Sequence, residues 1–290
     1  MDLLRQPAHT ALYNLLLELL GKAAQCADRL TDSDDNEALH DFRVALRRLN
    51  ANQRAYRKLL SVKLGKGVRS LARTTNGARD REVQLDWLRL QRKESDAHAR
   101  PDLDALIDKL ERAHEMERLH AYPHWQTAFA QLAEKLRHRL ESPQPGDVTK
   151  ESFAQAAGRQ IHTLSEKLRR SLCSIEKTPD DNAVHAARII GKHLRYLLEP
   201  LAAEVPGVPS LIKRLKVLQD LLGEIHDCQV RLDDFAGRRQ AELVNQYAAL
   251  QRGTAERRAQ LMDEFQTRWL GEHVGVLNKD LQRVIARLEQ

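Results

Sequence analysis

The chain has 290 residues, of which 30% are charged, with a formal net charge of +6 at pH 7 and a pI of about 9.3. No apolar run approaches the roughly 20 residues that a membrane-spanning helix needs, which excludes a membrane-spanning protein. The chain contains only 13 glycines and 9 prolines. Because long segments follow the helical period and clusters of β-branched residues are nearly absent, the composition predicts an all-α protein.

The amino-terminal segment, about residues 7–30, is predicted to be the first helix. Its apolar residues recur at helical spacing and are expected in a core: Leu12, Leu15, Leu16, Leu19 and Leu20. Asp2, Glu18 and the lack of a basic leader argue against a signal peptide. The three cysteines are scattered and form no CxxC pair, which is typical of reduced thiols, so we expect a cytoplasmic protein.

The next segment, residues 39–60, is predicted to be a helix with two different faces. Residues 31–37 supply N-cap candidates and acidic side chains, which the positive end of a helix dipole favours. The polar face carries, at steps of three and four, His40, Arg43, Arg47, Asn50, Arg54 and Arg57. The apolar face carries Leu39, Phe42, Leu46, Leu49, Tyr56 and Leu60. One face is therefore expected to pack in a core and the other to present positive charge.

The same pattern returns about 145 positions later, and its start signal, residues 178–182, returns with it. The positions of the polar face are repeated by His185, Arg188, Lys192 and Arg195, and those of the apolar face by Val184, Ala187, Leu194 and Leu198. Residues 42–79 hold eleven Lys or Arg and no acid, and residues 182–198 are also free of acids. Concentrated positive charge costs stability unless a counter-charge arrives from the fold or from a ligand. The repeat predicts two similar halves.

A second basic helix is predicted in each half. One follows a break around Gly65, and its counterpart spans residues 211–235. Their matching cations are Lys66 and Arg69 in the first half and Lys213 and Lys216 in the second, followed by Arg79-Asp80 and His226-Asp227. Whether these helices line the same groove as the preceding basic helices does not follow from the sequence.

The midpoint of the chain is marked by a Pro/Gly cluster at residues 142–146, which predicts a boundary between residues 1–143 and residues 147–290. Breaks are expected near Pro123, because proline disfavours a helical residue before it, and near Gly253 and Gly271 to Gly275. Four helical regions in each half predict a duplicated pair of antiparallel four-helix bundles.

The two repeated helices share the pattern H-x-x-R-[VI]-x-x-[RK]-x-L, which begins at His40 and at His185. Together with Arg79-Asp80 and His226-Asp227, this pattern resembles the CHAD family, the conserved histidine α-helical domain, over the whole chain. The resemblance implies pseudo-two-fold symmetry and a basic central surface that binds inorganic polyphosphate, often on polyphosphate granules. Some relatives carry a triphosphate-cleaving tunnel domain, but this chain lacks the alternating ExExK pattern, so we expect a stand-alone binding module.

The residue chemistry favours the same ligand independently. Polyphosphate is an unbranched polyanion, so a protein that binds it needs many converging cations, such as forked arginines, mobile lysines and histidines that gain charge near an anion. The predicted polyphosphate-binding residues are His40, Arg43, Arg47, Arg48, Arg54, Lys66, Arg69, His185, Arg188, Lys192, His193, Arg195, Lys213 and Lys216. Two simpler interpretations remain open: the basic faces are merely solvated, and the two leading histidines belong to a core or a cap.

No catalytic, metal-binding or cofactor-binding pattern is evident in the sequence. Asp80 and Asp227 adjoin Arg79 and His226, but neighbouring residues on a helix do not face each other, so structural roles are expected. The acidic pairs lack metal-ligand spacing, and there is no P-loop, GxSxG motif or zinc-type Cys/His set. We therefore expect a non-enzymatic protein without a metal or cofactor and without a membrane partner.

Two other functions remain as alternatives. The same basic surface would also suit nucleic acid, although only 13 aromatic residues argue against base stacking and no duplex-recognition motif is present. A polyphosphate-processing phosphohydrolase is the other alternative, motivated by the histidines and nearby aspartates. Protein partners do not follow from the sequence.

Overall fold

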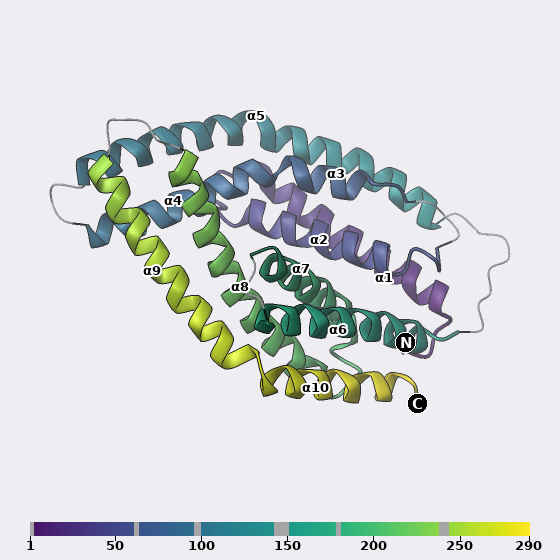
Figure 1. Cartoon of the computed structure of the whole chain (residues 1–290). Coiled ribbons are helices and arrows are strands. Elements are labelled where there is room, and N and C mark those ends of the chain that lie inside the picture. The colour runs from purple at the N-terminus through teal and green to yellow at the C-terminus, as the bar shows by residue number, and fades with distance from the viewer. Residues whose placement is uncertain (1–2, 61–63, 96–99, 142–150, 178–180, 238–243) are drawn as a thin grey trace. The chain divides into compact units, whose positions relative to one another are not determined.

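The computed structural model describes residues 3–60, 64–95, 100–141, 151–177, 181–237 and 244–290, and these residues fold almost entirely as α-helices (Figure 1). Within these ranges there is no strand, and extended pairing is limited to an isolated bridge between Pro7 and Ser152. The predicted all-α fold class is therefore confirmed. None of the described helices is long and apolar enough to cross a membrane.

The chain forms two compact units. Leu12–Val148 is the first-half unit, and Met1–Ala11 together with Thr149–Gln290 is the second-half unit. The predicted boundary cluster at residues 142–146 lies outside the described residues. The first helix begins among residues of the second-half unit and continues into the first-half unit, so the amino-terminal residues belong to the half that follows much later in the sequence.

The first-half unit contains, in chain order, α1 (Ala8–Asp28), the short 3-10 helix η1 (Arg29–Thr31), α2 (Ala38–Ala55), α3 (Gly67–Thr74), α4 (Asn76–Glu94) and α5 (Arg100–Glu141). The apolar series predicted for α1 is entirely buried, and so are Leu39, Phe42, Leu46, Leu49 and Tyr56 of the next predicted helix. Phe42 packs edge-to-face on Phe129 of α5, with ring centroids 5.4 Å apart. Burial of the α2 apolar face leaves its opposite, basic face for solvent.

α5 passes through Pro123 without interruption, so the break predicted there is wrong. The Thr127 hydroxyl donates to the Pro123 carbonyl oxygen at 2.9 Å, one turn further along the helix. Tyr122 and Trp125 are buried on either side of the proline. Burial of these two aromatic side chains offsets the backbone hydrogen bond that proline removes, so packing overrides the local preference. Figure 1 shows α4 and α5 side by side along the unit.

The second-half unit contains α6 (Phe153–Lys177), α7 (Asp181–Leu198), the 3-10 helix η2 (Glu199–Leu201), α8 (Val208–Gly237), α9 (Val244–Trp269) and α10 (Glu272–Leu288). The predicted apolar series of α7 is buried: Val184, Ala187, Leu194 and Leu198. Gly253 lies inside α9, so the break predicted there is wrong. The break predicted at Gly271 to Gly275 is confirmed at Gly271, whose φ of 62° is a conformation that glycine adopts without strain, whereas Gly275 lies inside α10.

Backbone hydrogen bonds join the amino-terminal residues to the rest of the second-half unit. Ala8 N donates to Glu151 O at 2.9 Å, and Phe153 N donates to Gln6 O at 3.0 Å. The Glu204 carboxylate accepts the backbone N–H groups of Leu3 and Leu4 at 3.1 and 3.4 Å. These contacts explain why the unit contains residues from the start of the chain.

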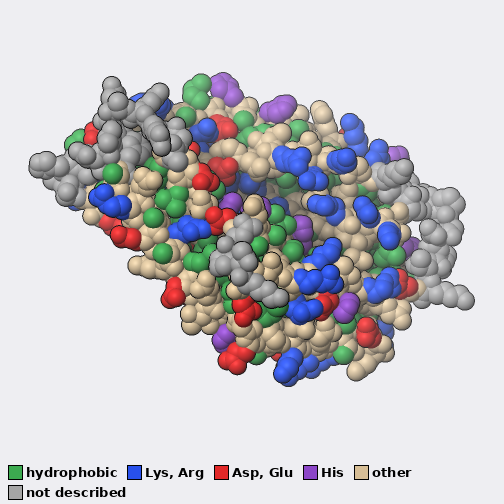
Figure 2. Space-filling view, in the orientation of Figure 1, with side chains coloured by type: hydrophobic (Ala, Val, Ile, Leu, Met, Phe, Trp, Pro, Cys, Tyr) green, Lys and Arg blue, Asp and Glu red, His purple; other side chains and the backbone are tan. Residues whose placement is uncertain are grey.

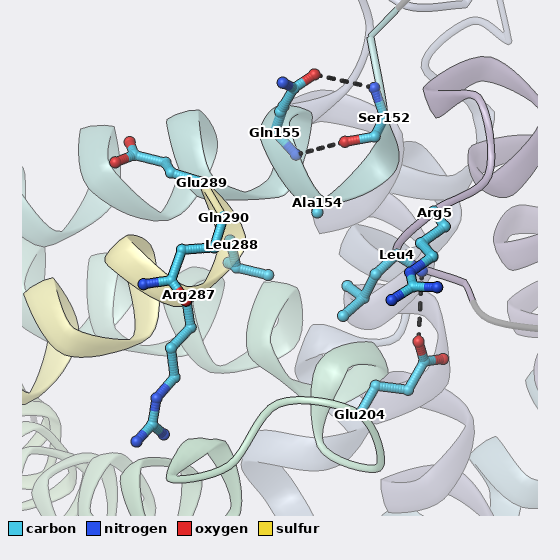
Figure 3. Close-up of a pocket in the computed structure, with 10 residues that line it drawn as sticks. All are labelled: Leu4, Arg5, Ser152, Ala154, Gln155, Glu204, Arg287, Leu288, Glu289 and Gln290. Atoms are coloured by element: carbon cyan, nitrogen blue, oxygen red, sulfur yellow. Dashed lines mark hydrogen bonds between the residues drawn. The ribbon is translucent and has the colours of Figure 1, made fainter.

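The start of α6 carries a reciprocal cap, which Figure 3 shows. Ser152 N donates to Gln155 Oε1 at 3.1 Å, and Gln155 N donates to Ser152 Oγ at 3.3 Å. This Ser-x-x-Gln arrangement satisfies two backbone N–H groups that would otherwise lack partners at a helix end. The cap therefore fixes where α6 begins.

Candidate functional site

In the first-half unit, α2 lies against α3 and the start of α4, and Arg43 makes the connection. Its guanidinium donates to Thr75 Oγ1 at 2.5 Å, to the Ala72 carbonyl oxygen at 3.3 Å and to Asn76 Oδ1 at 3.0 Å. These acceptors lie at the junction of α3 and α4, where the predicted single helix is divided at Thr75. The two basic helices of this half are therefore neighbours.

The positive charge of Arg43 is held in an unfavourable environment. Burial and the neighbouring Arg47 lower the pKa of Arg43 to about 10, so it stays protonated at neutral pH. The buried Nε atoms of Arg43 and Arg47 have no hydrogen-bond partner among the described residues. The fold thus leaves one buried donor of each side chain unused.

Other cations of this half are exposed and unneutralised. Within the described part of the chain, no carboxylate forms an ion pair with Arg43 or Arg47, nor with the exposed Arg54, Lys66, Arg69 and Arg73. Arg48 is half-buried and takes part in further interactions. Figure 2 shows Lys and Arg side chains gathered over the region where Figure 1 draws α2 and α3, with few acidic side chains among them. We name His40, Arg43, Arg47, Arg54, Lys66 and Arg69 the first basic face.

His40, at the start of this face, is half-buried near Arg79. Burial lowers the pKa of His40, and the positive charges of Arg79 and Arg47 lower it further. Arg79 donates to Glu82 Oε2 at 2.8 Å, and the Tyr122 hydroxyl donates to the other oxygen of Glu82 at 3.1 Å. Glu82 therefore fixes Arg79 to the packed interior. Sequence spacing does not indicate this link, because Tyr122 lies on α5, far along the chain.

In the second-half unit, α7 lies against α8, and two histidines meet across the contact. The rings of His185 and His226 have centroids 4.9 Å apart and planes inclined at 44°. One turn after His185 on α7 and one turn before His226 on α8, a Cβ added at Gly223 would stand 3.8 Å from Nε of Arg188. Glycine at this position leaves the Arg188 guanidinium close to the α8 backbone. The arrangement again places the two basic helices of one half side by side.

The surroundings lower the pKa of both histidines below the ordinary value. Burial lowers the pKa of His185, and Arg188 and Lys192 lower it further. Burial, Arg188 and His185 lower the pKa of His226, against the opposing effect of Asp227. Repulsion from the two cations outweighs the single carboxylate.

Arg195 differs from the other predicted binding residues, because its donors are used inside the unit. Its Nε donates to Gln219 Oε1 at 2.9 Å, and its Nη1 donates to the Glu199 carboxylate. Its guanidinium also lies 4.8 Å from the centroid of the Tyr196 ring. Gln219 in turn donates to the Gly191 carbonyl oxygen at 3.0 Å. This network joins α7 to α8, and a binding role for Arg195 stays a prediction.

The remaining predicted residues of this half lie on the same two helices. Lys213 and Lys216 are exposed on α8 and form no ion pair with any described carboxylate. Lys192 and His193 are half-buried on α7 and take part in further interactions. We name His185, Arg188, Lys192, Lys213, Lys216 and His226 the second basic face.

A cavity of about 730 Å³ lies elsewhere in the second-half unit, next to the amino-terminal residues (Figure 3). It mixes Arg5 and Arg287 with Glu204 and Glu289, so it offers no excess of positive charge to a polyanion. None of the predicted binding residues lines it. Among the described residues, no group of three or more His, Cys, Asp or Glu side chains is placed to hold a metal ion.

Comparison with known proteins gave a match in family and in fold. A model of the CHAD domain matches residues 14–236. The structure is similar to the crystal structure of the CHAD domain from the plant Ricinus communis, with 19% sequence identity, a TM-score of 0.67 and coverage of 96% of this chain and 93% of that chain. At this identity the structural likeness shows the fold alone. A search of curated proteins gave no match.

Proposed function

The chain belongs to the CHAD domain family, and on this premise we propose that it binds inorganic polyphosphate through the basic faces of its two units. The observation that carries the proposal is the set of unneutralised cations on α2 and α3, represented by Arg54 and Arg69, for which no described carboxylate is a partner. Repulsion among such charges is relieved when a polyanion supplies the missing counter-charge.

The geometry of the side chains supports phosphate as the bound group. Arg43 is fixed by three acceptors yet keeps a buried Nε–H without a partner, and Arg47 has the same unused donor. A phosphate oxygen accepts from guanidinium N–H groups through charge-assisted hydrogen bonds, which are stronger than neutral ones. A fixed arginine loses little conformational entropy on binding, so its contribution to affinity is large.

The exposed lysines extend each face beyond a single phosphate. Lys66 lies at the N-cap of α3 and Arg69 within α3, and Lys213 and Lys216 lie on α8, each beside the helix that carries the family pattern. A linear chain with about one charge per phosphate gains from several cations arranged along its path, and each phosphate that is neutralised releases counterions. We therefore propose polyphosphate rather than a single phosphate ion as the ligand.

The direct test is equilibrium titration with long-chain polyphosphate at about 0.1 M salt, where surface charges are screened beyond about 10 Å. One variant replaces two cations of each face: Arg54→Glu, Arg69→Glu, Lys213→Glu and Lys216→Glu. The matched control makes the same change of net charge at exposed positions on α5, α6 and α10: Lys109→Glu, Arg112→Glu, Lys167→Glu and Lys279→Glu. We expect the face variant to lose at least about a hundredfold in affinity. Equal losses in both variants would contradict the proposal.

Nucleic acid is the second candidate, since it shares the phosphate backbone. The first basic face contains no aromatic side chain on which a base would stack, which favours polyphosphate. Competition at equal phosphate concentration separates the two ligands. Polyphosphate should displace single-stranded RNA and duplex DNA, and the reverse result would favour nucleic acid.

We also propose that the protein binds polyphosphate without hydrolysing it. The support comes from the sequence, in which His40, His185 and their neighbouring aspartates form no recognised catalytic motif. Incubation with polyphosphate and magnesium or manganese should release no orthophosphate. Location on polyphosphate granules follows from binding, and a fluorescent fusion should lose it when the face variant is expressed.

A further inference from the structure

The two basic faces differ at the position where α2 and α7 begin. In the first-half unit, His40 lies near Arg79, whose charge is permanent and is paired with Glu82. The alignment of the two halves places His226 opposite Arg79 and Gln229 opposite Glu82. Gln229 donates to Asp233 Oδ1 at 2.9 Å. In the first half, Arg79 is paired with a carboxylate. In the second half, the matching residue is His226, which contacts the ring of His185 instead.

The histidine pair lies between cations rather than beside carboxylates. On α7, Arg188 and Lys192 act on both rings, and on α8 the charged neighbour is Asp227. Two arginines of α9 are paired with carboxylates of the neighbouring helices. Arg257 donates to Glu224 of α8 at 2.9 Å, and Arg258 donates to Asp181 at the start of α7. From α6, the contact with the start of α7 is polar and uncharged, since the Ser171 hydroxyl donates to the Ala183 carbonyl oxygen.

Protonation of this pair adds charge to a surface that is already positive. Without an anion, a second positive ring 4.9 Å from the first is opposed by its neighbour and by Arg188. With a phosphate oxyanion against Arg188, the same proton is attracted instead of repelled. Anion binding and proton uptake therefore promote each other, and by linkage each strengthens the other equally.

We infer that the His185–His226 pair is a proton-gated phosphate subsite, so that the second basic face binds polyphosphate more tightly as pH falls from about 8 to about 5.5. This inference rests on the proposed function. The first basic face has one histidine beside a permanently charged Arg79, so its charge changes less over the same range. The two halves of the duplicated chain would thus form one permanent and one acid-strengthened binding surface.

The test compares the affinity for long-chain polyphosphate at about pH 8 and about pH 5.5 in the wild type and in the variant His185→Gln with His226→Gln. Glutamine keeps a hydrogen-bond donor but cannot take up a proton. A long chain is used because terminal phosphates titrate in the same range, whereas internal ones stay ionised. A control with His162→Gln and His273→Gln removes two histidines from α6 and α10. Calorimetry in buffers of different ionisation enthalpy measures the protons taken up on binding.

We expect the wild type to gain about tenfold more affinity on acidification than the double variant does, with net proton uptake that the variant loses and the control keeps. His226→Arg, which copies Arg79, should bind tightly at both pH values. Equal pH dependence in the wild type and in the double variant would overturn the inference while leaving the proposed function intact. Absence of polyphosphate binding at either pH would instead refute the proposed function, and the subsite with it.

Discussion

The two basic faces carry cations at matching positions but neutralise them differently. Arg54 of the first face is exposed and has no carboxylate partner among the described residues, whereas the matching position in the second half is Glu199, which accepts from Arg195. Conversely, Arg79 of the first half is paired with Glu82, whereas its counterpart His226 forms no ion pair with a carboxylate in the described part of the chain. The two halves share their basic helices and most of the cations at matching positions, but differ in which of these cations have a carboxylate partner.

This difference separates two roles that look alike in the sequence. An arginine whose donors are used inside the fold stabilises the contact between helices, as Arg195 does between α7 and α8. An arginine such as Arg47, which has an unpaired buried Nε and no carboxylate partner among the described residues, raises the electrostatic energy of the free protein, and we propose that it gains from an anionic ligand. Under the proposed function, the first face is therefore expected to be the permanent binding surface and the second face the weaker one at neutral pH.

The largest expected effect distinguishes the faces directly. Arg54→Glu with Arg69→Glu should lower polyphosphate affinity by about a hundredfold at about pH 8, because two unneutralised cations become anions. Lys213→Glu with Lys216→Glu should lower it by only about tenfold, since that face has a neutral histidine pair at this pH. Fluorescence anisotropy with labelled polyphosphate measures both, with Lys109→Glu and Arg112→Glu as the control. Equal losses for the two faces would show that the comparison is wrong.

The next effect is a gain of affinity from making the second face resemble the first. Glu199→Arg copies Arg54 and releases Arg195 from its carboxylate. We expect about tenfold tighter binding, the order of one added charge-assisted contact to phosphate. Glu256→Arg, at an exposed position on α9, adds the same charge and should change affinity much less. A similar gain in both variants would mean that net charge alone controls binding.

A smaller effect comes from making the first half resemble the second. Glu82→Gln copies Gln229 and removes the carboxylate that pairs with Arg79 at 2.8 Å. The ion pair is largely shielded from solvent, so unfolding by urea should show a loss of about 1–3 kcal/mol. Affinity for polyphosphate should rise about threefold, because Arg79 is then unneutralised. Unchanged stability would mean that Glu82 does not hold Arg79 to the packed interior.

The smallest effect is the pH dependence of stability without ligand. The folded protein lowers the pKa values of His40, His185 and His226 below the ordinary value of 6.5, so the unfolded chain binds more protons near that pH. Their contribution to stability is therefore present above pH 6.5 and is lost as pH falls below it. Urea midpoints should decrease on acidification, less so for His185→Gln with His226→Gln. With saturating polyphosphate, the urea midpoint should fall less on acidification. A midpoint that rises on acidification would contradict this expectation.

The parts of the fold that were predictable depend on periodicity within one helix. The buried series of α1, α2 and α7 followed from residue spacing, and so did the end of α9 at Gly271. Pro123 and Gly253 were wrong as break points, because a local preference of a few kcal/mol yields to burial of neighbours such as Tyr122 and Trp125. Such burial depends on the partner helix and cannot be computed from the local sequence.

The site was predictable in its residue types and less so in its partners. The spacing of His40, Arg43 and Arg47 gave one helix face, and the repeat gave its counterpart. Glu199 follows the acid-free stretch of α7 and lies four residues after Arg195, a spacing from which their ion pair could have been predicted. The meeting of His185 with His226 depends instead on the packing of α7 on α8. Cross-helix contacts of this kind are not contained in sequence spacing.

The most direct test of the central claim is the salt dependence of polyphosphate binding. A linear polyanion bound by several unneutralised cations gives a logarithmic affinity that falls with the logarithm of salt concentration, by about 0.7 for each phosphate contacted on a single strand. The wild type should show a steep slope, and the variant with Arg54→Glu, Arg69→Glu, Lys213→Glu and Lys216→Glu should lose about 3 from it. The matched control on α5, α6 and α10 should keep the wild-type slope. A slope that is equally reduced in the control would contradict binding at the two basic faces.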